Sequence, residues 1–143
     1  MSGRILIVDD EPNHRRSLGI SLRLEGYEVV EACDGQQALE RLGEHTVDLA
    51  IIDLMMPRID GLELARRLRF AHPDVQVILM SAYHLTQKQL ERAEVGQIGF
   101  LPKPYELEQL LGQLQSRLQR SGAHSLVEVA EAEAEVKAKA AAS

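Results

Sequence analysis

Acidic, hydroxyl and basic side chains directly follow short apolar runs at several places in this sequence. Asp9 and Asp10 follow the run ILIV, and Asp53 follows the run LAII. Ser81 follows the run VILM, and Lys103 follows GFLP. If these runs are parallel strands of one sheet, the five side chains converge beyond the carboxyl ends of the strands, where open sheets of this kind bind ligands.

The residue types in this set suit phosphoryl chemistry. Three carboxylates placed close together repel one another unless one is protonated or a cation lies between them. Mg²⁺ takes oxygen ligands and often uses one or two carboxylates together with a phosphate. A lysine adds positive charge, and a hydroxyl can donate to an anionic oxygen. Transfer of a phosphoryl group requires mainly positioning and charge neutralisation, and a carboxylate can be the nucleophile.

Taken singly, these residues have ordinary structural explanations. Asp10 could cap a helix that begins near Pro12. Cys33, the single cysteine, is most simply a small residue after a strand rather than a nucleophile. The joint pattern at successive strand ends is what indicates a site.

Apolar spacing predicts five strands that alternate with five helices. Continuous apolar runs, typical of strands covered on both faces, occupy residues 5–8, 27–30, 49–52, 75–80 and 98–101. Helical periodicity occupies residues 13–25, 36–42, 62–70, 85–93 and 106–118. This order predicts an α/β fold with a mostly parallel sheet, helices on both faces and the leucines of the last helix in the core.

Composition narrows the functional classes. A chain of 143 residues suits one domain, and a net charge of -6 with two Phe, three Tyr and no Trp disfavours nucleic-acid binding. A single cysteine allows no internal disulfide, which fits a reducing cytoplasm. The sequence contains no signal peptide pattern and no membrane-spanning stretch.

The amino-acid composition of the chain changes near residue 120. We expect a domain at residues 1–120, followed at 121–143 by a linker and a tail rich in Ala, Glu and Lys. This tail is predicted to be disordered or partly helical, with a docking segment that orders on a partner as the alternative. The chain is expected to carry no fused output domain, although a piece of a longer protein would have the same sequence.

Four segments resemble the receiver domain of bacterial two-component response regulators, of the single-domain, chemotaxis-regulator type. They are ILIVDDEP, LAIIDLMMPRIDGLEL, VILMSAY and GFLPKPY, and the resemblance covers residues 4–119. It implies the flavodoxin-like (βα)5 fold, a doubly wound parallel sheet with strand order 2-1-3-4-5. Alternation of elements alone does not give that order.

The resemblance also implies a role for each residue of the set. Asp53 matches the residue that accepts a phosphoryl group from a histidine kinase or phosphotransfer protein. Asp10 directly, and Asp9 through water, match the acids that hold Mg²⁺, together with Asp53 and the backbone carbonyl of Met55. Lys103 matches the lysine that pairs with the acceptor carboxylate or with the phosphoryl oxygens. Self-catalysed phosphotransfer and dephosphorylation would be slow, so the chain is not expected to be an enzyme in the usual sense.

Other matched positions concern switching and kinetics. Ser81 matches the switch hydroxyl, Phe100 matches the switch aromatic, and the peptide bond before Pro104 matches one that is usually cis. Met55 and Tyr83 occupy the positions that tune dephosphorylation, two residues after the acceptor and after the switch hydroxyl. Neither has a carboxylate or amide to orient an attacking water, which predicts a long-lived phosphoryl group.

Phosphorylation is expected to reshape the face made by the fourth helix, the fifth strand and the fifth helix. An unknown downstream protein would dock there, on a face that includes His84, Lys88, Tyr105 and Glu108. The chain would be a monomer or a phosphorylation-dependent dimer, located in the cytoplasm, with no direct nucleic-acid or membrane partner.

Three other functions fit less well. A phosphorylation-independent adaptor usually lacks an acid or the lysine, and all are present here. A Mg²⁺-dependent phosphohydrolase commonly has a second Asp two residues after its nucleophile, where this chain has Met55. A flavodoxin-like electron carrier would need a phosphate-binding loop rich in Ser, Thr and Gly, which the sequence lacks.

Overall fold

A parallel sheet of five strands forms the centre of the protein, in a computed structural model that describes residues 3–54, 61–82 and 99–121. The strands are β1 (Arg4–Val8), β2 (Glu28–Ala32), β3 (Leu49–Asp53), β4 (Gln76–Ser81) and β5 (Gly99–Pro102). Their order across the sheet is β2-β1-β3-β4-β5, and every neighbouring pair is parallel. The expected strand order is therefore confirmed.

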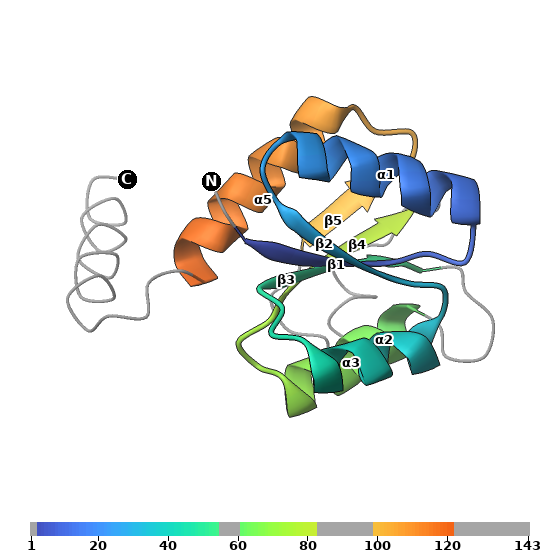
Figure 1. Ribbon diagram of the computed structural model, residues 1–143, viewed down its shortest axis with the longest axis vertical. Coiled ribbons are helices and arrows are strands. Elements are labelled where there is room, and N and C mark those ends of the chain that lie inside the picture. Colours follow the sequence, from blue (N-terminus) through green and yellow to red (C-terminus); the bar gives the residue numbers. More distant parts are fainter. Residues whose placement is uncertain (1–2, 55–60, 83–98, 122–143) are drawn as a thin grey trace, which may run out of the picture.

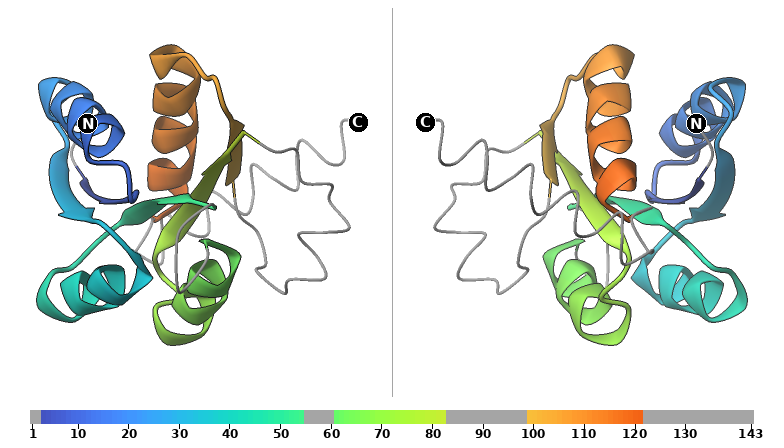
Figure 2. Two further views of the ribbon diagram at one scale, coloured as in Figure 1. Left: turned by 90° about the vertical axis from the view of Figure 1, so that its right-hand side faces the viewer. Right: turned by 90° about the vertical axis from the view of Figure 1, so that its left-hand side faces the viewer.

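Helices cover both faces of this sheet. The described helices are α1 (Pro12–Leu24), α2 (Gly35–Glu44), α3 (Gly61–Ala71) and α5 (Leu107–Ser121). Figures 1 and 2 show α1 and α5 on one face and α2 and α3 on the other. The helix predicted at residues 85–93 and the tail beyond residue 121 lie outside the described residues, so the expected tail stays a prediction.

Each face of the sheet has its own hydrophobic core. Alternate residues of one strand point to opposite faces, so Ile5 and Ile7 join the core under α1 and α5 while Leu6 and Val8 join the core over α2 and α3. Most of the α5 leucines expected in the core lie in the first of these cores: Leu110, Leu114 and Leu118 are buried, and Leu111 is partly buried against it. Leu107, at the first position of the helix, is exposed instead. Burial on both faces explains why the central strands read as continuous apolar runs.

The edge strand β2 extends further than its apolar run. The run predicts a strand at 27–30, whereas the strand ends at Ala32 because Glu31 and Ala32 pair with residues of β1. Helix α2 likewise begins at Gly35, one residue before the predicted 36–42 segment, because the Asp34 side chain caps it by accepting the Gln37 backbone N–H at 2.7 Å.

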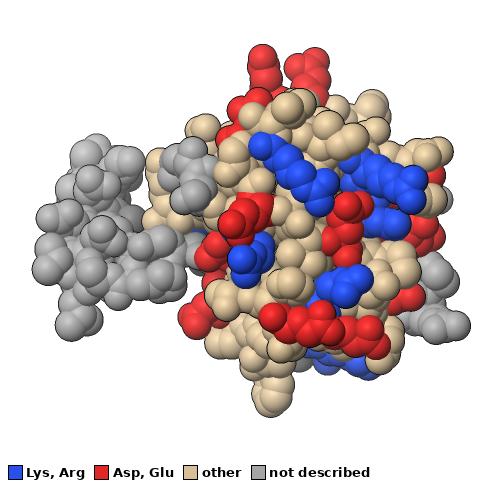
Figure 3. All heavy atoms as spheres, viewed as in Figure 1, with Lys and Arg blue, Asp and Glu red and all other residues tan. Residues whose placement is uncertain are grey.

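The surface carries both signs of charge. Figure 3 shows Lys and Arg side chains intermixed with Asp and Glu on the face seen in Figure 1. That face therefore presents no continuous basic surface of the kind that binds nucleic acid. Among the described residues, no helix is both long enough and apolar enough to cross a membrane.

Candidate functional site

Three carboxylates meet where β1 and β3 end. Val8 lies beside Ile52 in the sheet, so the residues that follow β1 leave it next to Asp53, the last residue of β3. One oxygen atom from each of Asp9, Asp10 and Asp53 lies within 4.8 Å of the others. Asp9 and Asp53 are buried, whereas Asp10 is exposed to solvent.

Lys103 reaches this cluster from the end of β5. Its backbone N–H donates to the carbonyl of Ser81 at 2.8 Å, which fixes the chain just beyond the strand. Its Nζ lies 2.9 Å from Oδ2 of Asp53. The Lys103–Pro104 peptide bond is cis. The structure thus brings the predicted lysine onto the predicted acceptor.

Ser81 and Phe100 lie on the same face of neighbouring strands. Phe100 is beside Leu79 in the sheet, and Ser81 is two residues further along β4, so both point toward the α3 side. The Ser81 side chain is buried, while Phe100 is partly buried against that core. The two expected switch residues therefore lie on one face of the sheet, two positions apart along the strands.

Gly61 allows α3 to begin close against the end of β3. A Cβ atom at this position would lie 2.6 Å from the carbonyl oxygen of Asp53 and 2.6 Å from Cα of Leu54. Both are backbone atoms, which cannot rotate away. Glycine at this position therefore allows the first turn of α3 to pack directly beside the end of β3, which carries Asp53.

The Asp9 carboxylate is fixed by donors on both of its oxygens. The backbone N–H of Glu11 donates to Oδ1 at 3.0 Å, and Nδ1 of His14 makes a very short contact with Oδ2. Burial alone would raise the pKa of Asp9, but these hydrogen bonds and the electrostatic effects of His14 and Lys103 outweigh it. The pKa of Asp9 therefore lies below its ordinary value, and the carboxylate stays ionised.

The first turn of α1 corrects one structural expectation. The helix is capped by Glu11 rather than by Asp10, because the Glu11 carboxylate accepts the backbone N–H groups of Asn13 and His14. Pro12 occupies the first helical turn and sets where the helix begins. Asp10 is therefore not needed as the cap of this helix.

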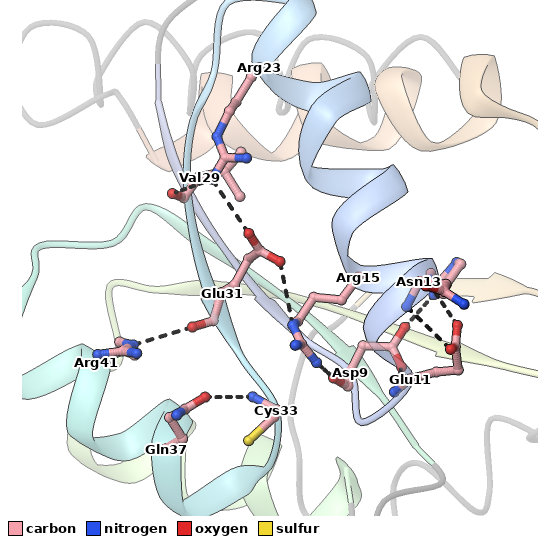
Figure 4. Close-up of polar contacts among 11 residues, drawn as sticks. Asp9, Glu11, Asn13, Arg15, Arg23, Val29, Glu31, Cys33, Gln37 and Arg41 are labelled. Carbon is pink, nitrogen blue, oxygen red and sulfur yellow. Dashed lines mark hydrogen bonds and ion pairs between the residues drawn. The ribbon is translucent and has the colours of Figure 1, made fainter.

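Arg15 holds the backbone of the segment that joins β1 to α1. Its Nη1 donates to the Asp9 carbonyl at 2.7 Å, and its Nε lies 3.4 Å from the Glu31 carboxylate on β2 (Figure 4). Arg23 approaches the other oxygen of Glu31 at 3.5 Å. This chain of contacts ties the end of β1 to the edge strand.

Sequence reasoning did not single out His14 or Arg15. The only signal in the sequence is their place in the first turn of a helix that follows a strand ending in acids. Tyr105, a residue expected on the docking face, has its hydroxyl 3.0 Å from Nε2 of His14. Burial, followed by the negative charge of Asp9, raises the pKa of Tyr105.

Four other predicted residues lie outside the described part of the chain. These are the expected carbonyl ligand and kinetic residue Met55, the kinetic residue Tyr83, and the docking-face residues His84 and Lys88. Glu108, the remaining docking-face residue, is exposed in the first turn of α5.

The described residues fit a hard divalent cation. Carboxylate oxygens are the ligands that Mg²⁺ prefers, and three of them gather here from Asp9, Asp10 and Asp53. Lys103 sets one ammonium against these three carboxylates, through its pairing with Asp53. The remaining negative charge is of the kind that a divalent cation would balance.

A family comparison decides what kind of domain carries this arrangement. The model of the response regulator receiver domain matches residues 5–115. The chain belongs to the response regulator receiver domain family. Receiver domains act in phosphorylation-dependent signalling by two-component systems, as phospho-acceptors rather than as enzymes of the usual kind.

Individual relatives agree with this assignment. The response regulator MprA of Mycobacterium ulcerans is 40% identical over 121 residues, which cover 85% of this chain and 52% of the relative. The chain thus spans about half the length of the curated relatives it matches.

Solved structures also share the fold. The response regulator TrrA of Thermotoga maritima, solved in complex with Mg²⁺ and BeF, matches with a TM-score of 0.73 and 35% identity, covering 80% of this chain and 98% of that one. The chemotaxis protein CheY4 of Vibrio cholerae matches with a TM-score of 0.74 and 30% identity, covering 81% of this chain and 98% of that one.

Proposed function

We propose that this receiver domain accepts a phosphoryl group on Asp53 from the phosphohistidine of a histidine kinase or phosphotransfer protein. A carboxylate oxygen of Asp53 forms a bond to phosphorus while the bond from phosphorus to the imidazole nitrogen breaks. The released imidazole takes up a proton from solvent. The observation that carries this proposal is the Lys103 ammonium, 2.9 Å from the Asp53 carboxylate beside two further acids.

Charge neutralisation is the main requirement of this transfer. The proposed Mg²⁺ ligands are Asp10, Asp53 and the carbonyl of Met55, with Asp9 acting through water. Mg²⁺ bound there would supply positive charge for the phosphoryl oxygens, and the related TrrA was solved in complex with Mg²⁺ and BeF. Lys103 would keep its position and pair with a phosphoryl oxygen.

Ser81 and Phe100 would transmit the effect of phosphorylation from Asp53 to the surface of the domain. A phosphoryl group brings up to about two negative charges and three acceptor oxygens, and the Ser81 hydroxyl would move to donate to one of them. Phe100, which lies on the same face of the sheet, would then turn inward. The face that includes α5 would change shape and recruit a downstream protein, and Glu108 is exposed on it.

Intact mass spectrometry after incubation with Mg²⁺ and acetyl phosphate tests this function. The expected result is one phosphoryl adduct on the wild type and none on Asp53→Asn or after addition of EDTA. Asp74→Asn is the matched control, because Asp74 is an exposed acid just before the amino end of β4, whereas the site lies beyond the carboxyl ends of the strands. It should be phosphorylated like the wild type.

A phosphorylation-independent adaptor is the main competing function. No adduct on a folded wild-type chain that binds Mg²⁺, with a cognate kinase also tried, would favour that alternative. An adduct that persists in Asp53→Asn would contradict the assignment of the acceptor.

A further inference from the structure

His14 joins two parts of the molecule that are far apart in the sequence. Its Nδ1 contacts Oδ2 of Asp9, and its Nε2 lies 3.0 Å from the hydroxyl of Tyr105. The His14 and Tyr105 rings meet edge to face, with centroids 6.1 Å apart and an interplanar angle of 71°. One imidazole thus bridges the acidic cluster and the turn between β5 and α5.

The direction of the first hydrogen bond follows from chemistry. An ionised carboxylate only accepts hydrogen bonds, so Nδ1 of His14 carries the hydrogen that it donates to Asp9. With the Glu11 backbone N–H on the other oxygen, both oxygens of this buried carboxylate are held. A carboxylate held in this way cannot rotate without breaking a hydrogen bond.

The side-chain contact of His14 adds to what the backbone already provides. Arg15 fixes the Asp9 carbonyl, and Glu11 caps the helix, so the main chain of this segment is held without the imidazole. What the imidazole adds is the orientation of the Asp9 carboxylate and the link to Tyr105. Loss of a partner that holds a direct metal ligand typically weakens metal affinity about 10- to 100-fold, and His14 holds an acid that is proposed to act on the cation through water.

We infer that His14 is a positioning residue that orients Asp9 for a divalent cation and couples that cation site to Tyr105, in the turn before α5. The inference rests on the cation site of the proposed function, and it adds a route to α5 that is separate from Ser81 and Phe100. It makes the affinity for Mg²⁺ depend on a hydroxyl that does not touch the cluster.

Calorimetric titration with Mg²⁺ measures this dependence without any phosphorylation. We expect His14→Leu, which removes both hydrogen bonds, to raise the Kd for Mg²⁺ about tenfold, the low end of that range. His14→Asn keeps an N–H close to the position of Nδ1 but loses the partner of the Tyr105 hydroxyl, so its Kd should rise about two- to fivefold, as in Tyr105→Phe. Tyr105→Phe, which loses only the hydroxyl, should raise the Kd about two- to fivefold.

A double variant tests the link itself. In the His14→Leu background, Tyr105→Phe should cause no further change, because the hydroxyl acts through the imidazole. Ser17→Ala is the control on α1, because Ser17 is exposed and three residues further along the helix. It should bind Mg²⁺ like the wild type.

A spectroscopic readout separates coupling from simple loss of structure. The backbone amide resonances of Tyr105 and Glu106 should shift when Mg²⁺ is added to the wild type and to Ser17→Ala, and should shift less in His14→Leu. Unfolding in EDTA checks that each variant is folded. If His14→Leu is not folded, His14→Asn and Tyr105→Phe carry the test.

Several results would overturn the inference. His14→Leu that binds Mg²⁺ as tightly as the wild type, or more tightly, would show that the imidazole does not support the site. Fully additive effects of His14→Leu and Tyr105→Phe would show that no link runs through the ring. A wild type that binds Mg²⁺ but accepts no phosphoryl group would contradict the proposed function alone, whereas one that binds no Mg²⁺ would contradict both.

Discussion

The Nζ atom of Lys103 lies 2.9 Å from Oδ2 of Asp53, although these residues follow β5 and end β3, two strands that β4 separates in the sheet. The lysine therefore reaches across the end of β4, where Ser81 accepts a hydrogen bond from its backbone N–H. The ends of β3, β4 and β5 thus hold Asp53, Ser81 and Lys103 close together.

Mg²⁺ should stabilise the folded chain. A ligand that binds only the native state adds about 2.7 kcal/mol to the free energy of unfolding when its concentration is 100 times its Kd. Urea unfolding with Mg²⁺ and with EDTA measures this increase.

Asp10→Asn should abolish most of this Mg²⁺ effect. In EDTA the same variant should be equal to the wild type or more stable by up to about 1 kcal/mol, because a like charge has been removed from an exposed position. A wild type whose unfolding is unaffected by Mg²⁺ would contradict the cation site.

Gly61→Ala should destabilise the protein by about 1–3 kcal/mol, the usual cost of forcing an extra carbon into a filled space. The new Cβ would meet backbone atoms of Asp53 and Leu54 at 2.6 Å. Gly112→Ala is the matched control, because that glycine lies within α5 and an added methyl group there would meet no neighbouring element within 4 Å. The control should gain up to about 1 kcal/mol from helix propensity, and equal losses in both variants would contradict this account.

Stability should fall in acid partly because of Asp9. Its pKa is lowered in the folded state, so its contribution is complete above the unfolded value of about 3.9 and is lost as the pH falls through the folded value. In EDTA, the free energy of unfolding of the wild type should therefore drop more steeply below about pH 4 than that of Asp9→Asn. A carboxyl NMR titration of Asp9 with a midpoint at or above about 3.9 would oppose this prediction.

Arg15→Ala should cost about 2 kcal/mol of stability, since it removes a charged hydrogen bond to the Asp9 carbonyl and an ion pair with Glu31. Arg15→Lys should recover only part of the loss, because one ammonium cannot replace both groups of a planar fork. Arg16→Ala, at the exposed neighbouring position, should stay within about 0.5 kcal/mol of the wild type. Chemical denaturation would show similar losses in the two alanine variants if Arg15 had no special role.

The strands and the convergence of Asp9, Asp53 and Lys103 could be predicted because apolar runs and chain order are local properties of the sequence. The strand order could not be derived from alternation and came from the resemblance. Contacts of His14 with Tyr105 could not be predicted, because the two residues are 91 positions apart and meet only through the packing of α1 against the turn before α5. The helix cap could not be predicted either, because three successive acids stand before Pro12 and Asp is a commoner cap than Glu, whereas the folded backbone places Glu11 at the cap.

The last prediction concerns how long the phosphoryl group remains on Asp53. Residue 55 is Met, which has no group to orient an attacking water, so Met55→Asn should accelerate loss of the phosphoryl group about tenfold or more by supplying an amide. Intact mass measured over time after removal of acetyl phosphate, with Mg²⁺ present, gives the rate. Met56→Asn is the matched control, because it introduces the same amide one position later and should leave the rate close to that of the wild type. Faster loss from the wild type than from Met55→Asn would show that another group on this chain already activates the water.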